Sequence, residues 1–258
     1  MCHDPRSRPP APPFVTDLDS TGFLELTAAD GNVLAAYEAI GAGTPRARLV
    51  VLPDVRGLHP YYQALAEEFA QAGVWTVVID YFGRTAGAHP RDDTFEFGPH
   101  VAQLTPEQVD LDVAAAVRHL SGEGTHPVHT LGFCFGGGHS WRLAASEVPL
   151  AGVIGLYGRP SLVAEVADAV HAPLLMLVAG ADHAIPAQDS LDVADRLRAA
   201  GKDVDVHVYE GAPHSFFDRS FADHADACAD AWRRMLAFLG AAGEPAEPAD
   251  DVTVPAAP

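Results

Sequence analysis

The chain has 258 residues, 48% of them hydrophobic, and a formal net charge of −19 from 16 Lys and Arg against 35 Asp and Glu. This length suits one α/β domain with a full core, and the charge disfavours nucleic acid or an anionic membrane surface as a partner. Its three cysteines are too few for a disulfide scaffold, so we expect a reducing, cytoplasmic setting, with neither a signal peptide nor a membrane span.

The predicted elements lie between a Pro-rich N-terminal arm over residues 1–20 and an Ala/Pro-rich tail over residues 241–258, which we expect to be disordered. We expect residues 21–240 to form one domain. Strands are expected at Gly22–Thr27, Val33–Ile40, Arg48–Leu52, Val74–Asp80, Val128–Phe133, Gly152–Tyr157, Leu174–Ala179 and Val204–Glu210. Helices are expected at Tyr61–Ala72, Pro106–Leu120, Phe135–Ser146, Ala187–Ala200 and Ser220–Leu239.

The order of these elements predicts the fold class. After a first hairpin, strands and helices alternate, and the apolar strands indicate a mostly parallel central sheet with helices on both faces. Ligands bind such sheets beyond the carboxyl ends of the strands, so we expect the chemistry there. Residues 81–105 lack a clear period and predict a loop or short-helix cap over the pocket.

The turn after the predicted strand Val128–Phe133 contains Gly132-Phe133-Cys134-Phe135-Gly136. This is the G-x-S-x-G pattern of a nucleophile elbow with cysteine in place of serine, and its glycines allow strand and helix to approach closely. Two later predicted strands end just before Asp182 and His214. Nucleophile, acid and histidine follow in this order in α/β-hydrolases. The sequence therefore predicts an α/β-hydrolase fold with Cys134 as nucleophile, His214 as base and Asp182 as the acid that orients it.

Two backbone N–H groups are expected to form an oxyanion hole. One belongs to Phe135, directly after the nucleophile, and the other to Val55, in the loop after the predicted strand Arg48–Leu52. Of the other cysteines, Cys228 lies on an apolar helical stripe and Cys2 in the arm, so neither competes for this role. The sequence has no metal-binding or nucleotide-binding motif, and we expect no metal and no cofactor.

The same segments carry a family resemblance. They are Gly132–Gly137, Gly180–His183 and Gly211–Phe216, with lesser matches at Ile79–Arg84 and Gly155–Gly158. Through them the chain, from about Leu49 to Leu239, resembles the dienelactone hydrolase family. The resemblance implies the α/β-hydrolase fold and the Cys-His-Asp triad, without a cofactor. It also implies the opening of an unsaturated enol-lactone.

A dienelactone carries a carboxylate, so arginine is expected in the substrate pocket. Arg84 and Arg91 are the candidates, with Arg56 as a third, and Tyr157 and Ser215 are further candidates in the matching segments.

The resemblance also implies a carboxylate after the first core strand that holds the resting thiol. Asp54 stands there, where family members have glutamate. Family members carry an arginine soon after the catalytic histidine, and here Asp218 occupies that place, with Arg219 one residue later.

Three functions stay open. The first is cleavage of a small enol-lactone or ester through an acyl-thioester on Cys134. The second is a broader carboxylesterase or thioesterase that acts on neutral small esters. The third is a non-catalytic, thiol-bearing binding module. In the enzymatic cases the partner is a small-molecule ester or lactone, and we expect a monomer or homodimer without nucleic acid or membrane partners.

Overall fold

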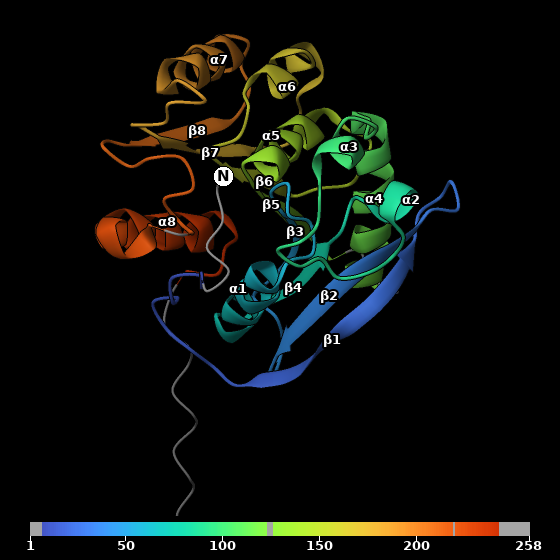
Figure 1. The fold of residues 1–258 in the computed structure, drawn as a ribbon. Helices are drawn as coiled ribbons and strands as arrows, with labels where there is room; N and C mark the ends of the chain where they lie inside the picture. The colour runs from blue at the N-terminus through green and yellow to red at the C-terminus, as the bar shows by residue number, and fades with distance from the viewer. Residues whose placement is uncertain (1–6, 123–125, 219, 243–258) are drawn as a thin grey trace, which may run out of the picture.

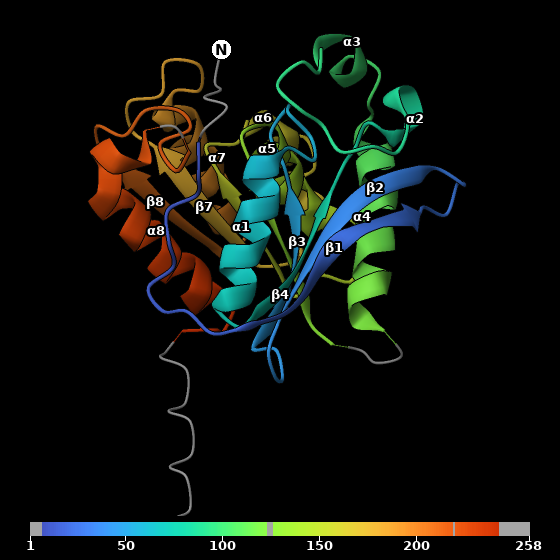
Figure 2. The same ribbon diagram turned by 60° about the horizontal axis from the view of Figure 1, so that its bottom comes forward.

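The computed structural model describes residues 7–122, 126–218 and 220–242, which contain one eight-stranded sheet (Figures 1 and 2). Its strands are β1 (Leu18–Thr27), β2 (Val33–Gly41), β3 (Ala47–Leu52), β4 (Val74–Ile79), β5 (Val128–Phe133), β6 (Gly152–Leu156), β7 (Leu174–Ala179) and β8 (Val204–Tyr209). The strand order is β1-β2-β4-β3-β5-β6-β7-β8. β2 pairs antiparallel with β1 and β4, and the pairs from β4 to β8 are parallel. The predicted fold class is confirmed.

Helices cover both faces of the sheet. They are α1 (Pro60–Gln71), α2 (Gly83–Ala86), α3 (Gly98–Val101), α4 (Pro106–Ser121), α5 (Phe135–Arg142), α6 (Ser161–Ala164), α7 (Ala187–Ala199) and α8 (Ala225–Phe238). α1 and α8 pack on one face, and α4 to α7 pack on the other (Figures 1 and 2). Within the described residues, no helix is both long and apolar enough to span a bilayer.

The core consists of two clusters separated by the sheet. In β3, Leu49 and Val51 belong to the cluster under α1 and α8, and Val50 and Leu52 belong to the opposite cluster. All four side chains are fully buried. Successive side chains of a strand point to opposite faces, so a strand covered on both sides is apolar throughout. This explains why the continuous apolar runs predicted parallel strands correctly.

Two helices begin at caps that the sequence encodes locally. α4 starts with a capping box, in which Thr105 and Gln108 exchange side-chain and backbone hydrogen bonds, and Pro106 occupies its first turn. α1 is capped by His59, whose Nδ1 accepts from the N–H of Tyr61 at 3.1 Å. Both caps therefore fix the residue at which the helix begins.

Several element boundaries differ from the prediction. The helix expected over Phe135–Ser146 ends at Arg142 and continues as a 3-10 turn over Leu143–Ala145. The helix expected over Ser220–Leu239 begins as a 3-10 turn, Phe221–His224. β1 starts four residues early because Leu18 pairs with Gly41 across a register shift.

The predicted arm and tail are described only in part. Residues 7–17 lie along α8 and α1, where Trp232 donates to the carbonyl of Pro10 at 2.9 Å and the N–H of Thr16 donates to that of Gln71 at 2.7 Å. Residues 1–6, with Cys2, and residues 243–258 of the predicted tail lie outside the described residues, as does Arg219.

Candidate active site

Cys134 occupies a strained turn between β5 and α5. Its backbone has φ 52° and ψ −109°, a combination that non-glycine residues rarely adopt. The turn is also tight, since a Cβ added to Gly132 would overlap the carbonyl of Gly136, and one added to Gly136 would overlap the carbonyl of Leu52. Close approach of strand, turn and helix therefore requires both glycines, as the elbow pattern predicts.

Asp182 and His214 follow the ends of β7 and β8 and are hydrogen-bonded to each other. His214 Nδ1 lies 2.5 Å from Asp182 Oδ2, and Asp182 Oδ1 accepts from the N–H groups of Ala184 and Ile185 at 2.8 and 3.0 Å. Burial alone would raise the pKa of Asp182, but these hydrogen bonds hold the pKa below its ordinary value. The charged carboxylate favours the tautomer with a proton on Nδ1, which leaves Nε2 as an acceptor.

Backbone strain gathers at this edge of the sheet. Among the described residues, Cys134, Tyr157 and Ser215 are the non-glycine residues with positive φ, at 52°, 38° and 61°. The ring centroids of Tyr157 and His214 lie 5.0 Å apart. Ser215 follows His214 in the chain, and its side chain is buried. Both predicted substrate-site residues therefore adjoin the Asp-His pair. Strain of this kind clusters at functional sites.

Two cavities border Cys134. The first, here called the apolar cavity, has a volume of about 300 Å³ and is lined by Val55, Val101, Cys134, Phe135, His139, Arg159, Leu162 and Ile185. The second, here called the acidic cavity, has a volume of about 450 Å³ and is lined by Asp54, Val55, Arg56, Asp92, Asp93, Thr94, Phe95, Glu96, Phe97 and Cys134. Both volumes suit a small organic ligand. Residues of the segment 81–105 line both cavities, which confirms the predicted cap.

The loop that carries Val55 is attached to the start of α5. The N–H of Gly136 donates to the carbonyl of Pro53 at 3.1 Å, and the hydroxyl of Tyr81 donates to the same oxygen at 2.5 Å. In the part of the chain that the structure describes, the N–H groups of Val55 and Phe135 donate to no protein acceptor. Val55 and Phe135 line the apolar cavity together with Cys134.

Comparison with known proteins decides the family. Residues 34–243 match the model of the dienelactone hydrolase family. The chain belongs to the dienelactone hydrolase family. It is 28% identical over 218 residues to a Yersinia pestis protein described provisionally as a carboxymethylenebutenolidase. The matched region covers 80% of this chain and 82% of that relative.

Solved structures agree with the family assignment. A Klebsiella pneumoniae protein described provisionally as a dienelactone hydrolase is 25% identical and superposes with a TM-score of 0.71, over 86% of this chain and 99% of that one. A dienelactone hydrolase of Anabaena variabilis is 20% identical, with a TM-score of 0.65 over 84% and 97% of the two chains, and shares the fold. The protein is accordingly a hydrolase with the α/β-hydrolase fold.

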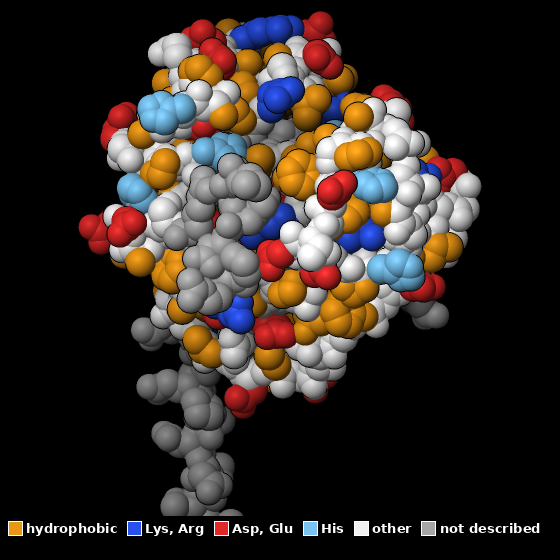
Figure 3. Space-filling view, viewed as in Figure 1, with side chains coloured by type: hydrophobic (Ala, Val, Ile, Leu, Met, Phe, Trp, Pro, Cys, Tyr) orange, Lys and Arg blue, Asp and Glu red, His pale blue; other side chains and the backbone are white. Residues whose placement is uncertain are grey.

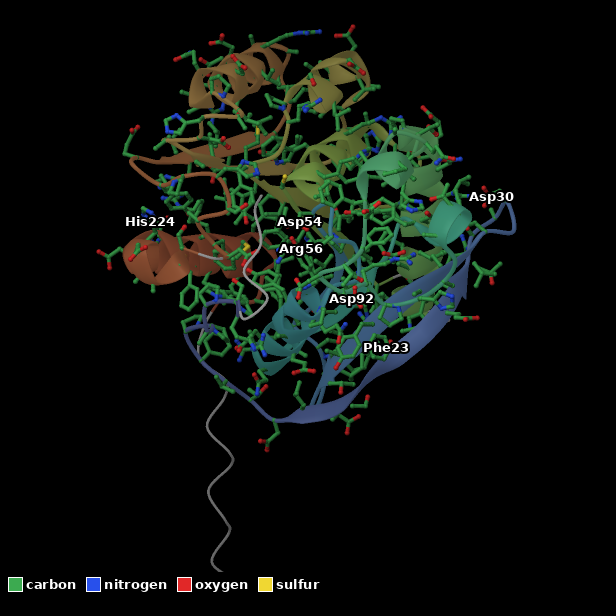
Figure 4. All side chains as sticks on the ribbon, viewed as in Figure 1. Phe23, Asp30, Asp54, Arg56, Asp92 and His224 are labelled. Carbon is green, nitrogen blue, oxygen red and sulfur yellow. The ribbon has the colours of Figure 1, made fainter. Side chains whose placement is uncertain are left out.

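In this dienelactone hydrolase family member, Asp54 is held by an arginine. Its two carboxylate oxygens accept from Arg56 Nε and Nη2, at 3.0 and 2.9 Å, and Arg56 also pairs with Asp218. All three side chains are buried, and Asp54 and Arg56 lie together near the centre of Figure 4. Asp218, where the resemblance implies arginine, thus completes an ion network around Arg56. That Asp54 holds the resting thiol stays a prediction.

The two arginines predicted to bind a substrate carboxylate are engaged within the protein. Arg84, in α2, pairs with Asp30 and with the buried Asp112, and Asp30 lies at the outer edge of Figure 4. Arg91 Nη2 binds the buried Asp80 at 2.8 Å. Neither arginine lines the cavities at Cys134. We therefore assign both to holding the cap segment 81–105 against the sheet, not to substrate binding.

Two polar residues of the apolar cavity were missed from sequence. His139 lies one helical turn after Phe135 on α5 and is only 5% exposed, and burial lowers its pKa to about 4. Arg159 lies three residues after the end of β6 and is exposed. The sequence held a sign of each. His139 stands at the i, i+4 spacing from Phe135, and Arg159 is a cation just beyond the end of a strand.

Proposed function

We propose that this hydrolase cleaves a small carboxylic ester or enol-lactone by transferring the acyl group to Cys134. The observation that carries the proposal is the position of Cys134. It lies on a strained turn at the start of α5 and borders the apolar cavity together with Val55 and Phe135, the two expected oxyanion donors. The Asp182–His214 hydrogen bond supports the same function.

The reaction has two halves. His214 Nε2 takes the thiol proton while the sulfur of Cys134 attacks the carbonyl carbon, and the N–H groups of Val55 and Phe135 bind the resulting oxyanion. The C–O bond then breaks, and the alcohol or enol leaves with the proton from His214. Water next attacks the thioester, again giving a proton to His214, and the thiol is restored when the acid departs. Asp182 stabilises the charged imidazole in both halves.

A cysteine suits an activated leaving group. Helix α5 begins directly after Cys134, and a helix N-terminus favours a thiolate. An enolate leaves far more readily than an amide nitrogen, so a soft nucleophile with modest acid assistance completes turnover. Enol-lactones and aryl esters are therefore the proposed substrates. The cytoplasmic location, the absence of nucleic acid or membrane partners, and the monomer or homodimer state stay predictions.

The test replaces one thiol at a time. We expect Cys134→Ala to lose hydrolysis of p-nitrophenyl butyrate by about 10³-fold or more with an unchanged circular dichroism spectrum. The matched control is Cys228→Ser, because Cys228 is buried in the core and burial raises its pKa to about 12. Mass spectrometry of the wild-type protein quenched during turnover should find the acyl group on the peptide that contains Cys134. A folded Cys134→Ala variant with full turnover refutes the nucleophile.

A further inference from the structure

The loop that carries Val55, residues 53–57, is closed by the carboxylate of Asp54. Asp54 Oδ1 accepts from the N–H of Arg56 at 2.9 Å, and the Asp54 carbonyl accepts from the N–H of Gly57 at 3.1 Å. Val55 is therefore the second residue of a four-residue turn whose leading aspartate binds the backbone two residues on, as is common in such turns. The direction of the Val55 N–H then depends on where the Asp54 carboxylate is held.

The side chain of Arg56 holds that carboxylate. Its Nε and Nη2 donate to the two oxygens of Asp54, at 3.0 and 2.9 Å, and Nη2 also pairs with Asp218. The guanidinium lies over the rings of Tyr61 and Tyr62, 5.0 and 5.3 Å from their centroids. A planar guanidinium shared by two carboxylates and stacked on two rings has a defined orientation, so it fixes the Asp54 carboxylate as well.

Asp218 belongs to the loop that carries the predicted base. It stands four residues after His214, and its N–H donates to the carbonyl of Ser215 at 3.0 Å. The ion pairs of Arg56 thus connect the Val55 loop with the loop that follows β8.

The N-terminal arm supplies a further contact to Asp218. Ser7 Oγ donates to Asp218 Oδ1, the carboxylate oxygen that Arg56 does not bind, and the side chain of Ser7 is buried. Ser7 precedes residues 34–243, which match the family model, so the match does not account for this contact. A residue of the arm is therefore two ion pairs away from the turn that holds Val55.

These four residues form a buried chain of contacts, here called the arm network: Ser7, Asp218, Arg56 and Asp54. Asp54 and Arg56 lie near the centre of the face in Figure 4, and Figure 3 shows acidic and basic side chains close together in that part of the face. Removing one partner of a buried ion pair leaves the other charge uncompensated, so the contacts depend on one another.

We propose that the arm network positions the N–H of Val55 for the oxyanion, so that the N-terminal arm supports catalysis through contacts behind the Val55 loop. This inference rests on the proposed function and adds positioning residues to it. No bond forms or breaks in the network. It also gives Asp54 a role that requires no contact with the thiol, because its carboxylate acts on the turn.

The experiment removes contacts of the network one at a time. Ser7→Ala removes the hydroxyl, and Asp218→Asn removes the charge but keeps the shape. Ser190→Ala and Asp110→Asn are the matched controls. Ser190 is a buried serine of α7, Asp110 is a carboxylate paired with Arg142, and neither borders the two cavities at Cys134.

Three measurements separate an effect on the oxyanion from an effect on the thiol. Turnover of p-nitrophenyl butyrate gives kcat and KM. Inhibition by 1,1,1-trifluoro-2-hexanone reports the oxyanion, because the thiol adds to this ketone and leaves a charged tetrahedral oxygen. Alkylation of Cys134 by iodoacetamide, followed from pH 5 to pH 10 by mass spectrometry, reports the thiolate, since attack on the CH₂ group forms no oxyanion.

We expect Asp218→Asn to lower kcat by about 10-fold or more, a part of what one oxyanion donor contributes, and Ser7→Ala to lower it by about 3-fold. The inhibition constant of the ketone should rise by the same factors. KM and the pH profile of alkylation should stay those of the wild type, and the two controls should change none of these quantities.

Two results overturn the inference while the proposed function stands. One is a folded Ser7→Ala variant with the kcat of the wild type, and this variant alone decides if Asp218→Asn does not fold. The other is a loss of kcat matched by an equal loss of alkylation rate, which would place the effect at the thiol. A wild type without turnover of p-nitrophenyl butyrate, or a Cys134→Ala variant that retains it, refutes the proposed function and the inference with it.

Discussion

The buried imidazole of His139 should make the fold sensitive to acid. Burial, assisted by the charge of Arg142, lowers the pKa of His139 to about 4, whereas a histidine in an unfolded chain has a pKa of about 6.5. At neutral pH both states are uncharged. As the pH falls below 6.5 the unfolded chain takes up a proton that the folded protein cannot bind. The contribution to stability is therefore present above the unfolded pKa and is lost as the pH falls toward the folded pKa.

The size of this loss follows from the two pKa values. The gap between about 6.5 and about 4, at about 1.4 kcal/mol for each tenfold change, gives a limiting loss of about 3 kcal/mol. Most of it, about 2 kcal/mol, is lost by pH 4.5. The variant His139→Asn has no titrating group at this position. The decrease in its free energy of unfolding between pH 7 and pH 4.5 should therefore be smaller by about 2 kcal/mol than that of the wild type.

Urea denaturation at pH 7 and pH 4.5 measures the difference directly. Both proteins share all other titrating groups, so these contributions cancel when the decreases are compared. His126→Asn is the control, because His126 is exposed. This control should lose as much stability as the wild type. If His139→Asn also loses as much as the wild type, the imidazole is not held neutral by burial and the reasoning is refuted.

Two further predictions concern the elbow and the triad acid. Gly132→Ala should lower the thermal unfolding midpoint markedly, since its Cβ would overlap the Gly136 carbonyl and cost a few kcal/mol, whereas Gly22→Ala meets no atom within 4 Å and should not; equal midpoints for the two variants would contradict the close approach. Asp182→Asn should lower kcat on p-nitrophenyl butyrate by roughly 10²–10⁴-fold in a folded protein, because the amide no longer stabilises the charged imidazole of His214. Unchanged kcat would remove Asp182 from the mechanism.

Local patterns in the sequence were sufficient for the strands and for the elbow. The eight predicted strands correspond to β1–β8, because each is a short apolar or alternating run bounded by turn residues. The glycines around Cys134 predicted a sharp turn, and the backbone of Cys134 has the positive φ of such a turn. Asp182 and His214 were also placed correctly relative to each other, since both follow parallel strands that end at one edge.

Helix ends were less accurate. The end of α5 at Arg142 was missed because apolar residues continue through the 3-10 turn Leu143–Ala145, and a 3-10 turn preserves much of the helical periodicity. The short helices α2, α3 and α6 have four residues each, too few to show a period.

Ion pairs depended on the tertiary structure. Arg84 pairs with Asp112, and Arg56 with Asp218, 28 and 162 residues away along the chain. With 35 carboxylates for 16 lysines and arginines, sequence alone offers every arginine several partners and no means of choosing among them. Two of the arginines that the sequence offered as substrate-binding candidates, Arg84 and Arg91, therefore lie in internal ion pairs away from the cavities at Cys134, and Arg159 was overlooked.

The sequence by itself determined which strands form, where the chain turns sharply at Cys134, and which acid and histidine follow the strands beside it, because periodicity and glycine sterics act over a few residues. Only the tertiary structure decided which charged groups neutralise each other and which side chains border Cys134. Those contacts join segments far apart in the chain, and burial and distance within the fold select them.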